Sequence, residues 1–164
     1  MQHRKEKRVP NLSELDEKLI DYLFKYKTAS SYQIHRDIYS GVHKSKKSTR
    51  VHLCRLIKRG YIHNRYNRFL EHIKHYGLTK TSILTNRSSL INREIIDDEN
   101  GLPTNSYCST HDMTLIEIWR NILKDSQVKE HWTENEYHFK SCKRAKEIHQ
   151  KLNGINPDGV ILYN

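Results

Sequence analysis

The sequence lacks any apolar run close to the roughly 18 residues that a membrane-spanning helix needs, and it has few cysteines. Its first eight residues are mostly charged and no apolar stretch follows them, so we expect no secretory signal. Cys54, Cys108 and Cys142 are an odd number at spacings unlike those of disulfide frameworks. We therefore expect reduced thiols in a cytoplasmic protein that has no membrane partner.

Acidic residues are scarce in the first half of the chain. Residues 1–88 contain 20 Lys and Arg against 7 Asp and Glu, whereas residues 89–164 contain 9 against 12. The formal net charge of +10 is therefore concentrated in one half. A basic segment beside a slightly acidic one is typical of a polyanion-binding module joined to a second unit, although a basic surface can also be solvated without a partner.

Two helices are predicted in the first forty or so residues. Ser13 is followed three residues later by Asp16, which is typical of a capping box, and apolar residues recur at helical spacing through residues 16–25. Residues 28–31 break this pattern. Ser30 or Ser31 then caps a short helix over residues 32–39, which ends at Gly41.

A third helix is the most informative segment, because it is apolar on one face and cationic on the other. It begins at a capping Ser48 and ends at Gly60. Its apolar stripe is formed by Val51, Cys54 or Leu53, and Ile57 with Leu56. Its outer face offers Lys46, Lys47, Thr49, Arg50, His52 and Arg55. A helix of this kind fits the major groove of DNA, which is about 12 Å wide.

The hydrophobic period changes to two after this helix, which predicts a hairpin. Residues 61–66 and 70–78 are expected to be its strands, and Thr79 is expected to cap a short closing helix through residue 85. The run STRVHLCRLIKRGYI resembles the recognition helix and first wing strand of bacterial winged-helix regulators, and HYGLTKTSILT resembles their second wing strand and next helix. This resemblance covers residues 12–86 and implies a winged helix-turn-helix that binds double-stranded DNA.

In winged-helix geometry the recognition helix enters the major groove by its N-terminal end and the wing lies along the backbone. We therefore expect Lys47, Thr49, Arg50 and His52 near bases, with Arg50 as the best reader of guanine. The remaining candidate DNA contacts are expected at phosphates or beside the base-contacting residues: Lys44, Lys46, Ser48, Arg55, Arg65, Asn67 and Arg68. For Arg55 and Lys58 we prefer a solvated helix face to a DNA contact. Residues 1–10 form a basic arm that either reaches a minor groove or is disordered.

The second half predicts a small α/β unit. A capped amphipathic helix starts at residues 109–112, with a buried face of Leu115, Ile118 or Ile116, Trp119, Ile122 and Leu123. Residues 128–134 are expected to form a strand, residues 137–152 have helical leanings, and Pro157-Asp158-Gly159 leads into an apolar end. The arrangement STHDMTLIEIW, HWTENE and INPDGVILY resembles the C-terminal region of the replication-relaxation family, which comprises MobC-type accessory proteins of plasmid mobilisation and replication.

That resemblance implies a winged helix followed by a domain similar to a restriction-endonuclease core. A nuclease of this type needs an acid after Pro on one strand and an acid-x-Lys pair on the next. Asp158 occupies the first position and Glu117 is a second candidate ligand, but no acid-x-Lys follows within the remaining six residues. We therefore do not expect catalysis. The sheet that begins here is truncated, degenerate or completed by another chain.

Two further groups of residues raise the alternatives of a zinc site and of a phosphohydrolase. Cys108 with His111, and His138 with Cys142, offer four ligands to Zn²⁺, but eleven histidines make such spacings common by chance. His111-Asp112 is found in phosphohydrolases, yet the partner residues of that chemistry are missing and a helix-capping role fits better. We expect neither a metal nor another cofactor.

These patterns together predict an α+β protein. Residues 1–88 form the winged helix, residues 89–106 a linker or edge segment, and residues 107–164 the small α/β domain. We expect a homodimer that binds double-stranded DNA in plasmid mobilisation or replication, with a relaxase or a replication protein as partner. A transcriptional repressor with a C-terminal dimerisation domain is the main alternative, and a metal-dependent nuclease is the third.

Overall fold

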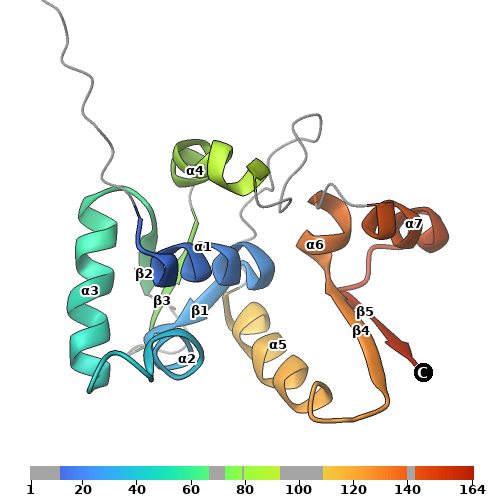
Figure 1. The fold of residues 1–164 in the computed structure, drawn as a ribbon, viewed down its shortest axis with the longest axis horizontal. Coiled ribbons are helices and arrows are strands. Elements are labelled where there is room, and N and C mark those ends of the chain that lie inside the picture. The colour runs from blue at the N-terminus through green and yellow to red at the C-terminus, as the bar shows by residue number, and fades with distance from the viewer. Residues whose placement is uncertain (1–11, 67–72, 79, 93–108, 140–142) are drawn as a thin grey trace, which may run out of the picture.

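The computed structural model describes residues 12–66, 73–78, 80–92, 109–139 and 143–164, and it has a mixed α+β fold (Figure 1). Its strands form two small antiparallel sheets, one of three strands and one of two. The α+β class predicted from the sequence is therefore confirmed. Among the described residues no helix is long and apolar enough to cross a membrane.

Helix α1 (Glu14–Tyr26) begins at Ser13, whose hydroxyl accepts the backbone N–H of Asp16 at 3.2 Å. This contact satisfies one of the N–H groups that the first helical turn leaves without a partner. The apolar side chains at helical spacing are all buried: Leu19, Ile20, Leu23 and Phe24. They form the centre of the hydrophobic core, as their period predicts.

A short strand separates the first two helices. Residues 28–31 were expected only to interrupt the helical pattern, but Thr28–Ser30 form β1, which pairs antiparallel with β3. Ser30 then caps α2 (Ser31–Ile34), and Gln33 completes the capping box. The chain continues as a π-helix, η1 (His35–Tyr39), so the predicted short helix is present with an irregular second half. Three residues are too few for periodicity to reveal a strand.

Helix α3 (Lys46–Lys58) is followed by the hairpin strands β2 (His63–Tyr66) and β3 (Lys74–Gly77). Gly60, in the left-handed region at φ 81°, allows the chain to leave the helix. Strand β3 lies in the middle of the sheet, in the order β1-β3-β2, with Asn64 opposite Tyr76 and Ala29 opposite the same residue. This register places the Tyr76 side chain in the core.

Helix α4 (Lys80–Asn92) is longer than predicted, because it continues well past residue 85 and past the expected domain boundary at residue 88. Leu90 explains the extension, since its side chain is fully buried in the same core as α1. Polar residues around it hid this contact from the periodicity.

The second half comprises α5 (Ser109–Ile122), β4 (Val128–Thr133), α6 (Glu134–Phe139), α7 (Lys143–Leu152) and β5 (Gly159–Tyr163). Strands β4 and β5 pair antiparallel. The buried positions of α5 include Met113, Ile116 and Trp119, so Ile116 rather than Ile118 faces inward. Leu123 is exposed and was wrongly expected in the buried face.

The two halves pack against each other. Ile116 of α5 belongs to the core cluster that α1 organises, and α5 lies against β1. Asn135 of α6 donates its side-chain N–H to the carbonyl of Phe24 at 2.6 Å. Figure 1 shows the result: α3 lies at one end of the long axis, and β4, β5 and α7 lie at the other.

Candidate nucleic-acid interface

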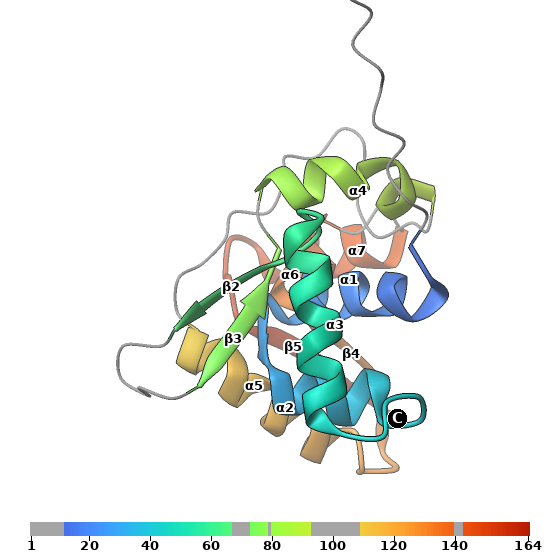
Figure 2. The ribbon, with the colours of Figure 1, turned by 90° about the vertical axis from the view of Figure 1, so that its left-hand side faces the viewer.

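Helix α3 lies on the outside of the molecule with its length uncovered by other elements, as Figure 2 shows. Its buried face consists of Thr49, Leu53 and Leu56. Leu53, one of the two alternatives for the predicted apolar stripe, and Leu56 are buried as expected, whereas Val51 is 48% exposed and Cys54, the other alternative, is also exposed. The true stripe is rotated from the predicted one because packing against η1 and α2, rather than side-chain apolarity alone, sets which face is inward.

The exposed face of α3 is basic. Its solvent-accessible residues are Lys46, Lys47, Ser48, Arg50, Val51, Cys54, Arg55 and Lys58. No Asp or Glu occurs in the sequence between Asp37 and Glu71, so the helix and both of its connections carry cations only. This face has the charge that a nucleic-acid backbone attracts.

The helix starts three residues earlier than predicted. Ser45, not Ser48, is its N-cap, and the Ser45 hydroxyl accepts the backbone N–H of Ser48 at 3.2 Å. Ser48 therefore lies within the first turn, where its exposed hydroxyl is 3.1 Å from that of Ser45. Lys46 and Lys47 are helical residues rather than part of a preceding loop.

Thr49 does not lie on the outer face, so the expectation of a base contact there is wrong. The residue is 0% exposed, and its Oγ1 lies 2.8 Å from Nδ1 of His35 and 3.0 Å from Nδ1 of His43. A hydroxyl has one proton, so at least one of these imidazoles must donate to it. Thr49 is thus a buried polar link between η1, the following turn and α3.

The side chain of His52 also makes an internal contact, with the carboxylate of Asp16. Its Nε2 lies 2.6 Å from Oδ1 of Asp16, which is only 5% exposed. The same carboxylate accepts hydrogen bonds from the hydroxyls of Ser13 and Tyr39, both at 2.8 Å. Burial raises the pKa of Asp16, but the hydrogen bonds from His52, Ser13 and Tyr39 outweigh it and hold the pKa below 3.8. An ionised Asp16 accepts only, so Nε2 of His52 carries the proton.

Arg50 and Lys46 remain exposed and are held by contacts with α2. The Nε of Arg50 donates to the hydroxyl of Ser31 at 3.3 Å. The Nζ of Lys46 lies 4.3 Å from the ring centroid of Tyr32, a cation–π contact. Both cations therefore have defined positions beside the N-terminal half of α3.

Parts of the predicted interface lie outside the described residues. The backbone of Arg65 pairs with His75 in the hairpin, but its side chain, Asn67 and Arg68 lie outside the described part, as does the basic arm of residues 1–10. Lys44 is described and exposed. In Figure 2 the hairpin β2–β3 lies beside α3, so the two predicted contact elements are neighbours.

A hollow on the flank of α3 was not predicted. It is lined by His43, Ser45, Lys47, Ser48, Val51, His52 and Arg55. His43, Ser45 and Val51 are not among the predicted contact residues. His43 was missed because it precedes the helix and carries no periodic signal in the sequence. Its approach to α3 depends on the turn after η1, where the N–H of His43 donates to the carbonyl of Tyr39 at 2.8 Å.

The two candidate ligands of a nuclease site are engaged with different partners. Glu117 accepts hydrogen bonds from Gln33 at 2.9 Å and from Arg36 at 2.9 Å, on the α2–η1 side. Asp158 instead lines a pocket together with Lys27 and Asp112, and its Oδ1 lies 3.0 Å from Nε2 of His111. The structure therefore does not bring Glu117 and Asp158 together as ligands.

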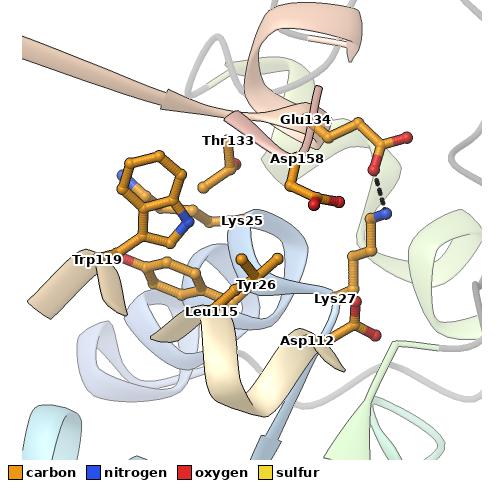
Figure 3. Close-up of a pocket in the computed structure, with 9 residues that line it drawn as sticks. All are labelled: Lys25, Tyr26, Lys27, Asp112, Leu115, Trp119, Thr133, Glu134 and Asp158. Carbon is orange, nitrogen blue, oxygen red and sulfur yellow. Dashed lines mark hydrogen bonds and ion pairs between the residues drawn. The ribbon is translucent and has the colours of Figure 1, made fainter. Parts of the chain in front are cut away.

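Figure 3 shows the pocket around Asp158, where Asp112 and Glu134 also lie. The Nζ of Lys27 forms an ion pair with Glu134. Over the described ranges no three His, Cys, Asp or Glu side chains are arranged to hold a metal ion. Of the four proposed zinc ligands, the structure describes the side chain of His111 alone, since those of Cys108, His138 and Cys142 lie outside the described part.

No model of a known protein family and no curated protein matches this sequence.

Proposed function

We propose that this chain binds double-stranded DNA through a winged helix formed by α1, α2–η1, α3 and the sheet β1-β3-β2. The element order supports this proposal: helix, strand, helix, helix and then a hairpin whose second strand pairs with the first strand of the chain. The observation that carries it is the exposed, acid-free face of α3 beside that hairpin.

The dimensions of α3 suit a major groove. Thirteen residues at 1.5 Å each make a helix about 20 Å long, and a helix with its side chains is as wide as the groove. Lys47 and Arg55 lie two turns apart on one flank and face phosphates, while Lys58 extends the same basic face. The hairpin is placed to follow the neighbouring backbone, as a wing does.

Arg50 is the proposed base reader. Its Nε is held by Ser31 at 3.3 Å, which leaves the two terminal nitrogens for a guanine edge. A fixed guanidinium loses less side-chain entropy on binding than a free one. After a preferred site has been selected from random duplexes, we expect Arg50→Ala to weaken that site far more than random DNA. Equal losses on both would reduce Arg50 to a phosphate contact.

For the biological role, we propose an accessory protein in plasmid or mobile-element mobilisation or replication, acting as a homodimer with a relaxase or replication protein. A two-fold dimer doubles the few base pairs that one winged helix reads. A transcriptional repressor is the alternative. Mapping the bound sites in cells distinguishes them, because a site at an origin beside a relaxase gene supports the first role and a site over the protein's own promoter supports the second.

The binding proposal is tested by fluorescence anisotropy with a labelled mixed-sequence duplex over a series of salt concentrations. We expect wild-type affinity to fall steeply with salt, and we expect the double variant Lys47→Ala, Arg55→Ala to lower the slope of log K against log salt by about one unit for each phosphate that the two cations contact. Lys151→Ala, an exposed lysine on α7, is the matched control and should keep the wild-type slope. A double variant indistinguishable from wild type, or no binding at low salt, would overturn the proposal.

A further inference from the structure

The hollow beside α3 has the chemistry of an anion site. Lys47 and Arg55 supply fixed positive charge, and Ser45 and Ser48 supply hydroxyls. The described residues that line it include no carboxylate. Lys47, Val51 and Arg55 follow one another at four-residue spacing, so they share one flank of the helix and place the two cations at either end of the hollow.

His43 is held rigidly at the edge of this hollow. Its ring stacks on that of Tyr39, with centroids 4.7 Å apart and an interplanar angle of 5°. Its Nδ1 is engaged by the buried hydroxyl of Thr49 at 3.0 Å. Nε2 is therefore the ring atom that remains for a ligand in the hollow.

The groups that face His43 come from three elements. His35 and Tyr39 belong to η1, and His35 shares the Thr49 hydroxyl with it. His52 of α3 lies with its ring centroid 5.3 Å from that of His43. Asp16 of α1 lies behind His52, buried and engaged by its three hydrogen-bond donors, while Lys47 and Arg55 share the hollow with His43.

These surroundings oppose the charged form of His43 in the free protein. Burial lowers the pKa of His43 below 6.5, and the neighbouring His52 and His35 lower it further, while Asp16 acts weakly in the opposite direction. The imidazole is therefore mainly neutral at pH 7. An anion in the hollow reverses the balance, because negative charge beside Nε2 favours the imidazolium.

We propose that one phosphodiester of the DNA backbone occupies this hollow and that the imidazole of His43 takes up a proton from solvent when it does, so that Nε2–H donates to the phosphate. The inference rests on the proposed DNA binding and adds a named phosphate site with proton-linked affinity. Lys47 and Arg55 attract the phosphate at any pH, and the His43 imidazolium donates to it only below the pKa that the bound complex imposes. DNA affinity therefore falls as the pH rises.

The experiment measures duplex affinity by anisotropy at constant ionic strength between about pH 5.5 and 8.5, in wild type, His43→Gln and His149→Gln. One linked proton makes wild-type affinity fall by at most about tenfold per pH unit across this window. His43→Gln should remove most of this fall, whereas His149→Gln on α7 should keep it. NMR titration of the imidazole of His43 in wild-type protein, with and without the duplex, should show its pKa raised by DNA.

The possible results separate the two proposals. Wild-type binding with the same pH dependence in His43→Gln, or an imidazole pKa unchanged by the duplex, overturns the phosphate site and leaves DNA binding intact. Absence of duplex binding by wild type at every pH overturns the DNA-binding proposal itself. The NMR measurement needs no variant, so a fold damaged by His43→Gln does not prevent a decision.

Discussion

The carboxylate of Glu117 lies 2.9 Å from the guanidinium of Arg36, and this pair joins the middle of α5 to η1 across more than eighty residues of sequence. The side-chain N–H of Gln33 also donates to Glu117 at 2.9 Å and to the carbonyl of Met113 at 2.9 Å. The helix pair that supports α3 is thus tied to the second half of the protein by two largely buried side chains, Arg36 and Gln33, that share the partly exposed Glu117.

Removing Glu117 should weaken this connection. We expect Glu117→Ala to lower the free energy of unfolding in urea by about 1 kcal/mol, because Arg36 and Gln33 lose a shared acceptor. Glu14→Ala is the matched control, since Glu14 forms an exposed pair with Lys18 within α1 and its loss should lower the free energy of unfolding by much less. Equal effects of the two variants would show that the Glu117–Arg36 contact adds no more stability than an exposed pair within one helix.

The burial of Thr49 separates a structural role from a base contact. Thr49→Val keeps the side-chain shape but leaves Nδ1 of His35 and of His43 without their shared hydroxyl, so we expect a loss of about 1–2 kcal/mol in unfolding free energy. Ser48→Ala, at the adjacent exposed position, should change stability by much less. The ranking of DNA sequences by affinity should be the same in Thr49→Val as in wild type, and a changed ranking at full stability would restore the base contact.

Asp16 should make stability depend on acid pH. Although burial raises its pKa, hydrogen bonds from His52, Ser13 and Tyr39 hold it below 3.8, the value expected in the unfolded chain. A carboxyl with a lowered pKa in the folded state stabilises the fold above the unfolded pKa, and this contribution is lost as the pH falls towards the folded pKa.

We therefore expect the urea-unfolding free energy of wild type to decrease on acidification below about pH 4, and Asp16→Asn to show a smaller decrease. Asp125→Asn, at an exposed carboxylate in the turn after α5, serves as the control. Parallel stability–pH curves for wild type and Asp16→Asn would contradict the assignment.

Gly159 should not tolerate a side chain. A Cβ at this position would lie 2.7 Å from the carbonyl oxygen of Trp132 and would collide with the indole of Trp119. We expect Gly159→Ala to lower the melting temperature and cost about 1–3 kcal/mol through overpacking of β5 against α5. Gly41→Ala has no atom within 4 Å of the added Cβ and should be nearly neutral. An unchanged melting temperature in Gly159→Ala would show that Gly159 does not lie against Trp119 and Trp132 as described.

Sequence alone was sufficient where the signal is local. The cap at Ser13, the apolar period of α1 and the turn at Gly60 predicted elements that the structure contains, because each depends on backbone hydrogen bonding and dihedral preference within a few residues. The alternation after Gly60 likewise predicted the two strands of the hairpin, with ends a few residues longer than those observed.

Contacts between distant residues decided the rest. Strand β1 exists because β3 pairs with it, α4 extends because Leu90 reaches the core, and α3 is rotated so that Thr49 faces inward. The basic character of α3 was therefore determined by its amino acids. Packing against η1 and α2 decided which of its cations point outward and that His43 lies with them beside the same hollow. The periodicity of a sequence shows which face of a helix is apolar. The elements that pack against that face determine which polar side chains are buried there and need hydrogen-bond partners.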